Sequence, residues 1–410
     1  MPNLKSLNRH KWAFSARFRT KGYGWKGSSL ACQRLKEAVS EIKRVTKTDP
    51  VTGAEGAVLL MEKIWPAFQQ IDTSSGALGS AVYNTMEVLL PILIEAPADR
   101  KTRDKWLDRL WEAIMDDGVD YLSQLGDRWG EVCGSKEVAS AWVDASLSLT
   151  REVLTSPSGG IFHGTTACLS SLVAAERYQE LFDLLEASRY KFWHYRKFGV
   201  LALAKMGKKA EAIQYAEDSR DPKYPTRDID RVCEEILISS GLYEEACKRY
   251  GLTAHTGLTY LARFHAVAKR YPMKDKAEIL KDLIATTPGG EGKWFAAAKD
   301  LGLYDLALKL AFQSHCDPKT LNRAARDYQE KIPKFALGVA IASLKWMSAG
   351  WGYEITGADI MNAFKLAMQA ADRLGMSTQV KSDIKKMVAA DMSTGKFVQQ
   401  VLGKYLEEKT

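Results

Sequence analysis

The chain has 410 residues, of which 46% are apolar and 26% charged, and an apolar fraction of this size excludes a largely disordered protein. Its six cysteines are far apart and form no CxxC pair, which argues against a zinc site, so we expect neither a metal ion nor a cofactor. The N-terminal sequence lacks a secretory signal, and no apolar run comes close to the ~20 residues of a membrane span. We therefore expect a cytoplasmic protein that does not associate with a membrane.

The positive charge is concentrated at the N-terminus. The whole chain has a formal net charge of +8, whereas residues 1–47 alone contain twelve Lys or Arg against Glu37 and Glu41. The local net charge is therefore +10, and the rest of the chain carries −2. A partner attracted by positive charge is expected at this end of the chain.

Residues 1–27 form a basic arm in which cations alternate with aromatic residues. One interpretation is a strap that docks on the first helices, with its rings buried and its cations in water. The other is a nucleic-acid-binding element, whose cations contact phosphates and whose rings stack on bases. In the second interpretation the binding residues are Arg17, Arg19, Lys21, Trp25 and Lys26.

Residues 28–158 are predicted to form an N-terminal helical region, because apolar residues recur there with helical spacing and no strand alternation is found. Ser28 is expected to cap the first helix, which Asp49 and Pro50 would end near Lys47. Further helices are expected at about 76–96, 99–116 and 136–155. The cluster of Ser, Pro and Gly at residues 156–160 predicts a domain boundary.

Residues 161–345 repeat a pattern of paired helices. A small or aliphatic residue recurs at intervals of 31, 34, 33, 28 and 29 residues, at Leu181, Ala212, Ala246, Ile279, Ala307 and Ala336. A period near 34 residues is typical of helix-pair repeats, in which a small residue lets neighbouring helices approach closely. Gly207, Gly241 and Gly302 stand where the first helix of a pair would end.

This pattern resembles tetratricopeptide repeats in its Gly-x-Tyr/Lys-x-x-Ala turn and in the register of the second helix. The resemblance implies an all-α fold, an α-solenoid of antiparallel helix pairs. For function it implies a non-enzymatic scaffold that binds a protein segment in a concave groove. Residues 346–410 would then be C-terminal capping helices.

A second, weaker resemblance precedes the repeats. Residues 72–81, Asp-Thr-Ser-Ser-Gly-Ala-Leu-Gly-Ser-Ala, and the Trp-rich helix some 25 residues further on resemble the helical region of bacterial SWIM zinc-finger proteins. The CxC and CxH zinc ligands of that family are missing here. The resemblance therefore implies a bacterial helical protein without a bound metal.

Catalytic patterns are weak in this sequence. His163 and Cys168 lie close enough in sequence to suggest a thiol nucleophile and a base, and a helical enzyme built on them is a third hypothesis. The paired acids Asp116–Asp117 and Glu234–Glu235 point about 100° apart on a helix, so they are expected on solvated faces rather than in a shared carboxylate site. We expect no enzyme.

The first helix of each repeat carries the residues predicted to bind a partner, since first helices line the concave side of such arrays. These residues are Trp193, Arg196, Arg231, Arg263, Lys293, Arg323 and Arg326. If their side chains share a face, the groove would take an acidic protein segment or a phosphate backbone. Alternatively, the cations pair with nearby acids such as Asp228, Glu234 and Asp327.

Overall fold

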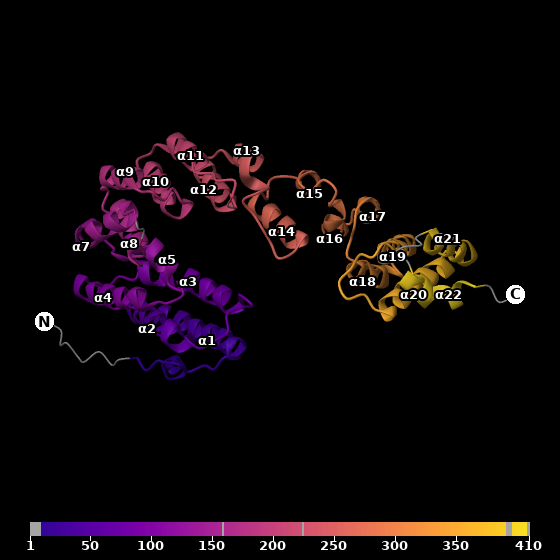
Figure 1. The fold of residues 1–410 in the computed structure, drawn as a ribbon, viewed down its shortest axis with the longest axis horizontal. Helices are drawn as coiled ribbons and strands as arrows, with labels where there is room; N and C mark the ends of the chain where they lie inside the picture. The colour runs from indigo at the N-terminus through magenta and orange to yellow at the C-terminus, as the bar shows by residue number, and fades with distance from the viewer. Residues whose placement is uncertain (1–9, 158–159, 224, 391–395, 408–410) are drawn as a thin grey trace. The chain divides into compact units, whose positions relative to one another are not determined.

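The structure is a computed structural model that describes residues 10–157, 160–223, 225–390 and 396–407 (Figure 1). These residues form helices α1 to α22 and three short 3-10 or π-helical turns, and no strand occurs among them. The prediction of an all-helical fold is confirmed. The chain divides into two compact units, residues 1–224 and 225–410, each with its own buried apolar clusters.

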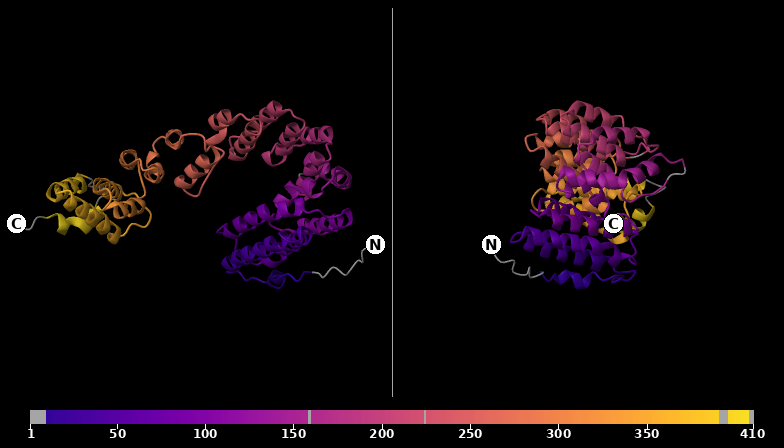
Figure 2. Two further views of the ribbon diagram at one scale, coloured as in Figure 1. Left: turned by 180° about the vertical axis from the view of Figure 1, so that it is seen from behind. Right: turned by 90° about the vertical axis from the view of Figure 1, so that its left-hand side faces the viewer.

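The first unit starts with a 3-10 turn, η1 (Ala13–Arg17), that lies against the first helix; Figure 2 shows the same ribbon from two further sides. The helices that follow are α1 (Ser28–Thr46), α2 (Pro50–Phe68), α3 (Ala77–Glu95), α4 (Arg100–Asp116), α5 (Ser123–Asp127), α6 (Trp129–Val132), α7 (Lys136–Thr155), α8 (Thr165–Ala174), α9 (Tyr178–Ala187), α10 (Trp193–Lys205) and α11 (Lys209–Glu217).

Short polar side chains set several of these helix starts. The carboxylate of Asp49 accepts a hydrogen bond from the backbone N–H of Thr52 at 3.0 Å, and Pro50 is the first residue of α2. The predicted helix end at Asp49 is thus also the cap of the next helix. The predicted cap at Ser28 is wrong, because α1 already begins at Ser28 and Gly27 precedes it without a side-chain cap.

Tryptophans fill much of the interior of the first unit. Trp106 and Trp129 are almost fully buried. The Trp111 ring lies 5.5 Å from that of Trp129 and 4.9 Å from that of Trp142, which brings α4, α6 and α7 together. Rings of this size bury a large area per residue, which suits a core built from short helices.

A buried arginine in the same core binds carbonyl groups at the C-terminal ends of two helices. Arg103 of α4 donates hydrogen bonds to the carbonyl oxygens of Ala96 at 2.7 Å and Val132 at 2.9 Å, just after α3 and at the end of α6. Carbonyl groups at helix C-termini lack helical partners and carry partial negative charge. Burial lowers the pKa of Arg103, and the carbonyls take the place of an acidic partner.

Helix α3 is the one helix of the described residues that is long and apolar enough to cross a membrane. The sequence-based statement that no apolar run reaches this length is therefore wrong for α3. In the structure its apolar residues, among them Leu78, Met86 and Leu93, lie in the core of the first unit against α1 and α2.

The second unit is a further series of helices. They are α12 (Arg227–Ile238), α13 (Tyr243–Ala246), which continues as the π-helical turn η2 (Cys247–Gly251), α14 (Tyr260–Arg270), α15 (Lys276–Ala285), the 3-10 turn η3 (Glu291–Trp294), α16 (Phe295–Asp300), α17 (Tyr304–Gln313), α18 (Pro318–Tyr328), α19 (Pro333–Ser348), α20 (Gly357–Arg373), α21 (Ser377–Ala390) and α22 (Lys396–Leu406).

The predicted repeat glycines occupy the turns between paired helices. Gly207, Gly241 and Gly302 have φ angles of 79°, 76° and 75°, in the left-handed region where a helix commonly ends. No neighbouring atom lies close to where a Cβ would stand at these positions, so the backbone conformation alone explains the glycine.

The compact units divide the chain differently from the predicted segments. Residues 158 and 159, in the predicted boundary, lie outside the described residues, and α7 and α8 on either side of them pack against each other. The predicted start of the capping helices at residue 346 falls inside α19. Helices α20 to α22 pack against α19 and against one another.

Candidate functional site

The N-terminal arm is docked on the first unit over residues 10–27, a segment called the strap below. Its rings Trp12, Phe14, Phe18 and Tyr23 are buried in the core formed with α1 and α2. Their burial confirms the docked interpretation for these four residues. Trp25 is different, since 66% of the residue's surface is exposed.

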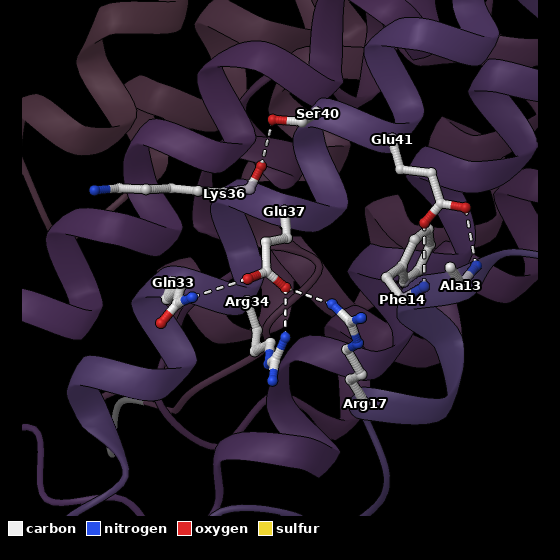
Figure 3. A network of polar contacts seen from close by, with 9 residues as sticks. All are labelled: Ala13, Phe14, Arg17, Gln33, Arg34, Lys36, Glu37, Ser40 and Glu41. Atoms are coloured by element: carbon white, nitrogen blue, oxygen red, sulfur yellow. Dashed lines mark hydrogen bonds and ion pairs between the residues drawn. The ribbon is translucent and has the colours of Figure 1, made fainter.

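Two glutamates of α1 hold the strap, as Figure 3 shows. The Glu41 carboxylate accepts hydrogen bonds from the backbone N–H groups of Ala13 at 2.9 Å and Phe14 at 3.1 Å. Glu37 accepts hydrogen bonds from Arg17 and, at 2.6 Å, from Arg34. The hydrogen bond from Arg34 is the main reason that the pKa of Glu37 is lowered.

The candidate nucleic-acid-binding residues of the strap differ in their contacts and exposure. Arg17 is paired with Glu37, and Arg19 donates a hydrogen bond to the carbonyl oxygen of Ala16 at 3.0 Å. Lys21 has a φ of 53°, and its backbone N–H donates to the Pro66 carbonyl of α2 at 2.7 Å. Lys21, Trp25 and Lys26 all leave their side chains exposed.

The predicted partner-binding residues are split between the two units. Trp193 and Arg196 belong to α10 of the first unit. Trp193 is partly buried, and Arg196 donates a hydrogen bond to Ser219 Oγ at 2.7 Å while its guanidinium lies 4.4 Å from the centre of the Tyr215 ring. Both contacts of Arg196 are with side chains of this chain, so packing within the first unit explains its position.

In the second unit Arg231, on α12, is exposed and forms no ion pair with any described residue. Arg263, on α14, is held in the structure: its guanidinium donates to the Leu252 carbonyl at 2.5 Å and lies 5.7 Å from the centre of the Trp294 ring. Burial lowers the pKa of Arg263. This residue supports the packing between helices rather than a free surface.

The remaining candidates lie further along the second unit. Lys293, in η3, is exposed, and its ammonium lies 5.6 Å from the centre of the Tyr260 ring. Arg323 of α18 is exposed and donates to Thr320 Oγ1 at 3.0 Å. Arg326 pairs with Asp327 at 3.0 Å, as the alternative interpretation expects for that residue.

One contact joins the exposed faces of neighbouring first helices. His265 of α14 lies 2.9 Å from a carboxylate oxygen of Asp300 at the end of α16, and both side chains are about half exposed. Lys269 of α14 and Lys319 of α18 also stand on exposed positions of these helices. The sequence comparison of repeats missed these two lysines, because it aligned the helix pairs by their buried residues.

A buried carboxylate, also missed from the sequence, lies under the same region. Glu234 of α12 has no exposed surface, so its predicted place on a solvated face is wrong. One of its oxygens lies 2.8 Å from His255 Nε2 and accepts a hydrogen bond from the hydroxyl of Tyr271, and Arg270 lies 3.7 Å from the other. Asp117 of the first acidic pair is likewise buried.

A pocket of about 1190 Å³ opens beside Tyr271, between η2 and α15. Two of its three cations are paired with acids, since Lys274 pairs with Asp282 at 2.6 Å and Arg270 with Glu235 at 3.0 Å, and the third is the exposed Lys248. The remaining lining is largely apolar, which suits an apolar side chain better than an anion. The π-helical turn that forms one wall has no recognised signal in the sequence.

The residues of the enzyme hypothesis are not arranged as a nucleophile and a base. Cys168 of α8 is buried, and burial raises the pKa of its thiol. His163 is exposed and lies 3.7 Å from Asp120, and no hydrogen bond joins it to Cys168. A reactive cysteine needs access and a lowered pKa. Across the described part of the chain no three His, Cys, Asp or Glu side chains gather as metal ligands.

No protein-family model matches the sequence, and no curated protein is similar enough to count as a match. The resemblances to tetratricopeptide repeats and to the helical region of SWIM proteins therefore stay hypotheses.

Proposed function

We propose that the chain is a non-enzymatic scaffold of tetratricopeptide-like helix pairs that binds an acidic protein segment on the first helices of its second unit. The observation that carries the proposal is that Arg231, Lys293 and Arg323 are exposed on three of these helices and none of them pairs with a carboxylate among the described residues. Exposed cations that form no ion pair within the chain can meet the carboxylates of a partner.

The packing of the helices supports a stacked arrangement of pairs. Within the second unit α14 contacts α16 and α18 contacts α20, so in these two cases a helix packs against the second helix after it along the chain. Second helices do the same where α17 contacts α19. Such alternating contacts are what an array of stacked helix pairs requires, and the positive-φ glycine turns agree with it.

The chemistry of this surface favours an acidic segment over an apolar one. Lys269 and Lys319 add to the charge of the three candidate residues, and the exposed acids on the same helices are partly used, Asp300 by His265 and Asp327 by Arg326. Opposite charges at an exposed surface mainly steer association and select partners. We therefore expect binding that weakens as the salt concentration rises.

The test is charge reversal at the three exposed cations. A full-length variant with Arg231→Glu, Lys293→Glu and Arg323→Glu is compared with the wild type for binding of a fluorescently labelled twenty-residue poly-glutamate peptide, measured by anisotropy. Loss of at least tenfold in affinity with an unchanged melting temperature is expected, because exposed charges contribute little to stability. Arg263 is left intact, since its buried contacts make its reversal destabilising.

The matched control reverses three exposed lysines on second helices, Lys276, Lys309 and Lys334. It changes the net charge by the same amount, so it should bind the peptide nearly as the wild type does. Equal losses in both variants would show that only net charge matters, and unimpaired binding by the first variant would place the binding surface elsewhere. Either result would overturn the proposal.

A further inference from the structure

Glu37 and Glu41, the two acidic residues among residues 1–47, both form hydrogen bonds within the fold. The carboxylate of Glu41 accepts hydrogen bonds from two backbone N–H groups of the strap, and that of Glu37 accepts hydrogen bonds from Arg17 and Arg34 (Figure 3). The exposed cations of residues 10–47 that form no ion pair with a described residue are Lys11, Arg19, Lys21, Lys26, Lys36, Lys43, Arg44 and Lys47.

These cations are not explained by the stability of the strap or of α1. Like charges on one surface repel each other and lower stability. The partial negative charge at the C-terminus of α1 favours Lys43 and Arg44 in its last turn, but it does not reach back to Lys36. Figure 3 shows the ammonium of Lys36 directed away from Arg17 and the strap. A ligand with several negative charges would relieve the repulsion.

We propose that the strap and the exposed face of α1 bind single-stranded nucleic acid. Lys36, Lys43 and Lys47 recur at helical spacing on one side of α1 and extend about 16 Å along the helix axis. A single strand carries one charged phosphate per nucleotide, so a row of cations of this length can contact several phosphates of one strand. This inference concerns the first unit and does not depend on the function proposed for the second unit.

Trp25 supplies the second part of the site. It is exposed between Lys21 and Lys26, and its backbone is held, because its carbonyl accepts a hydrogen bond from the Asp72 N–H at 3.0 Å. An exposed indole at a fixed place, flanked by cations, can stack on an unpaired base. Four other rings of the strap are buried, so the exposure of this one is selective.

A membrane surface fits this face less well. Among residues 10–47 the exposed large apolar side chains are Trp25 and Leu30. Helices and straps that enter a bilayer interface present a continuous apolar face beside their cations. Here the cations dominate and the ring stands nearly alone, as it does on surfaces that stack bases.

The experiment uses the full chain and a fluorescently labelled twenty-nucleotide oligo-dT, with binding measured by anisotropy at about 50 mM and 200 mM salt. Binding that weakens at least tenfold over this range is expected, because displaced counterions make each phosphate contact salt-dependent. The variant K43E/K47E should bind at least tenfold more weakly than the wild type. Its control, K101E/K105E, reverses two exposed lysines of α4 with the same spacing and should bind within about twofold of the wild type.

Trp25→Ala separates stacking from charge. It removes no charge and a side chain that is mostly exposed, so folding should be unaffected, and affinity for oligo-dT should fall about tenfold while binding of heparin stays unchanged. Equal affinities of K43E/K47E and K101E/K105E, or a Trp25→Ala variant with full affinity for oligo-dT, would overturn the inference. Tighter binding to anionic phosphatidylserine vesicles than to oligo-dT would also overturn it, in favour of a membrane surface.

Discussion

The hydroxyl of Tyr271, at the end of α14, donates a hydrogen bond to the buried carboxylate of Glu234 on α12. The same oxygen of Glu234 lies 2.8 Å from His255 Nε2. Burial alone would raise the pKa of Glu234, but the hydrogen bonds from His255 and Tyr271 and the charge of Arg270 outweigh it and lower the pKa. The carboxylate thus ties two helices and the loop between them in its ionised form.

This network predicts a loss of stability on acidification. Because the pKa of Glu234 is lower in the folded protein than in the unfolded chain, its ionised form stabilises the fold above the ordinary pKa of a glutamate. That contribution is lost as the pH falls through the folded-state pKa. In urea denaturation at pH 7, Glu234→Gln should reduce the free energy of unfolding by about 1–3 kcal/mol, and the difference from the wild type should shrink toward pH 3.

The control for this measurement is Glu244→Gln, at an exposed position of α13. Its free energy of unfolding should stay within about 0.5 kcal/mol of the wild type at both pH values. A Glu234→Gln variant as stable as the control at pH 7 would show that the buried carboxylate contributes nothing to folding.

The sequence predicted the helices well and the contacts of their polar residues poorly. The repeat glycines and the small residues Ala212, Ala246 and Ala307 have local or near-neighbour roles, and the structure places the glycines in turns and buries the alanines. Glu234 was misplaced because its partners His255 and Tyr271 lie 21 and 37 residues further on, and only the fold brings them together.

The candidate site shows the same limit. The cations of the first helices could be identified from their spacing, but spacing could not distinguish the exposed Arg231 from Arg263, whose guanidinium contacts the Leu252 carbonyl and the Trp294 ring. In the strap, burial of the rings was one of two interpretations that the sequence left open, and the exposure of Trp25 depends on where the chain turns.

The thiols should differ sharply in reactivity. Cys32 is partly exposed, whereas the other five cysteines are buried. Burial raises the pKa of Cys133 and of Cys316 to about 12. Thiolates are the reacting species, so Cys32 should be alkylated first by iodoacetamide at pH 8 and the buried thiols only after unfolding.

Peptide mapping by mass spectrometry identifies the modified residue. The Cys32→Ser variant should lose the fast reaction, and the Cys133→Ser variant should keep it. Fast alkylation of Cys133 in the native wild type would contradict the packing of α6 against α8.

Gly56 of α2 should not tolerate a side chain. A Cβ at this position would lie 2.3 Å from Cζ2 of the Trp12 ring, which the strap places against α2. Gly56→Ala should therefore displace Trp12 and lower the free energy of unfolding by about 1–3 kcal/mol.

The matched substitution Gly79→Ala in α3, where no atom lies within 4 Å, should raise stability by up to about 1 kcal/mol. Thermal melts followed by Trp fluorescence and circular dichroism measure both, and a Gly56→Ala variant at least as stable as the wild type would show that Trp12 does not occupy this place.

Glu41 should govern the docking of the strap. Its carboxylate is 12% exposed and binds two backbone N–H groups, and hydrogen bonds to a charged group contribute more than neutral ones. Glu41→Ala leaves these donors without a partner and should lower the free energy of unfolding by about 2 kcal/mol.

Because Trp12 and Phe14 lie next to the lost anchor, the strap should open before the helices unfold, and limited trypsin digestion should cut at Lys11, Arg17 or Arg19 faster than in the wild type. Glu112→Ala, at an exposed position of α4, removes the same charge and should leave the cleavage rate unchanged. If both variants are cut at the wild-type rate, the buried rings alone hold the strap, and the contribution of Glu41 to docking is negligible.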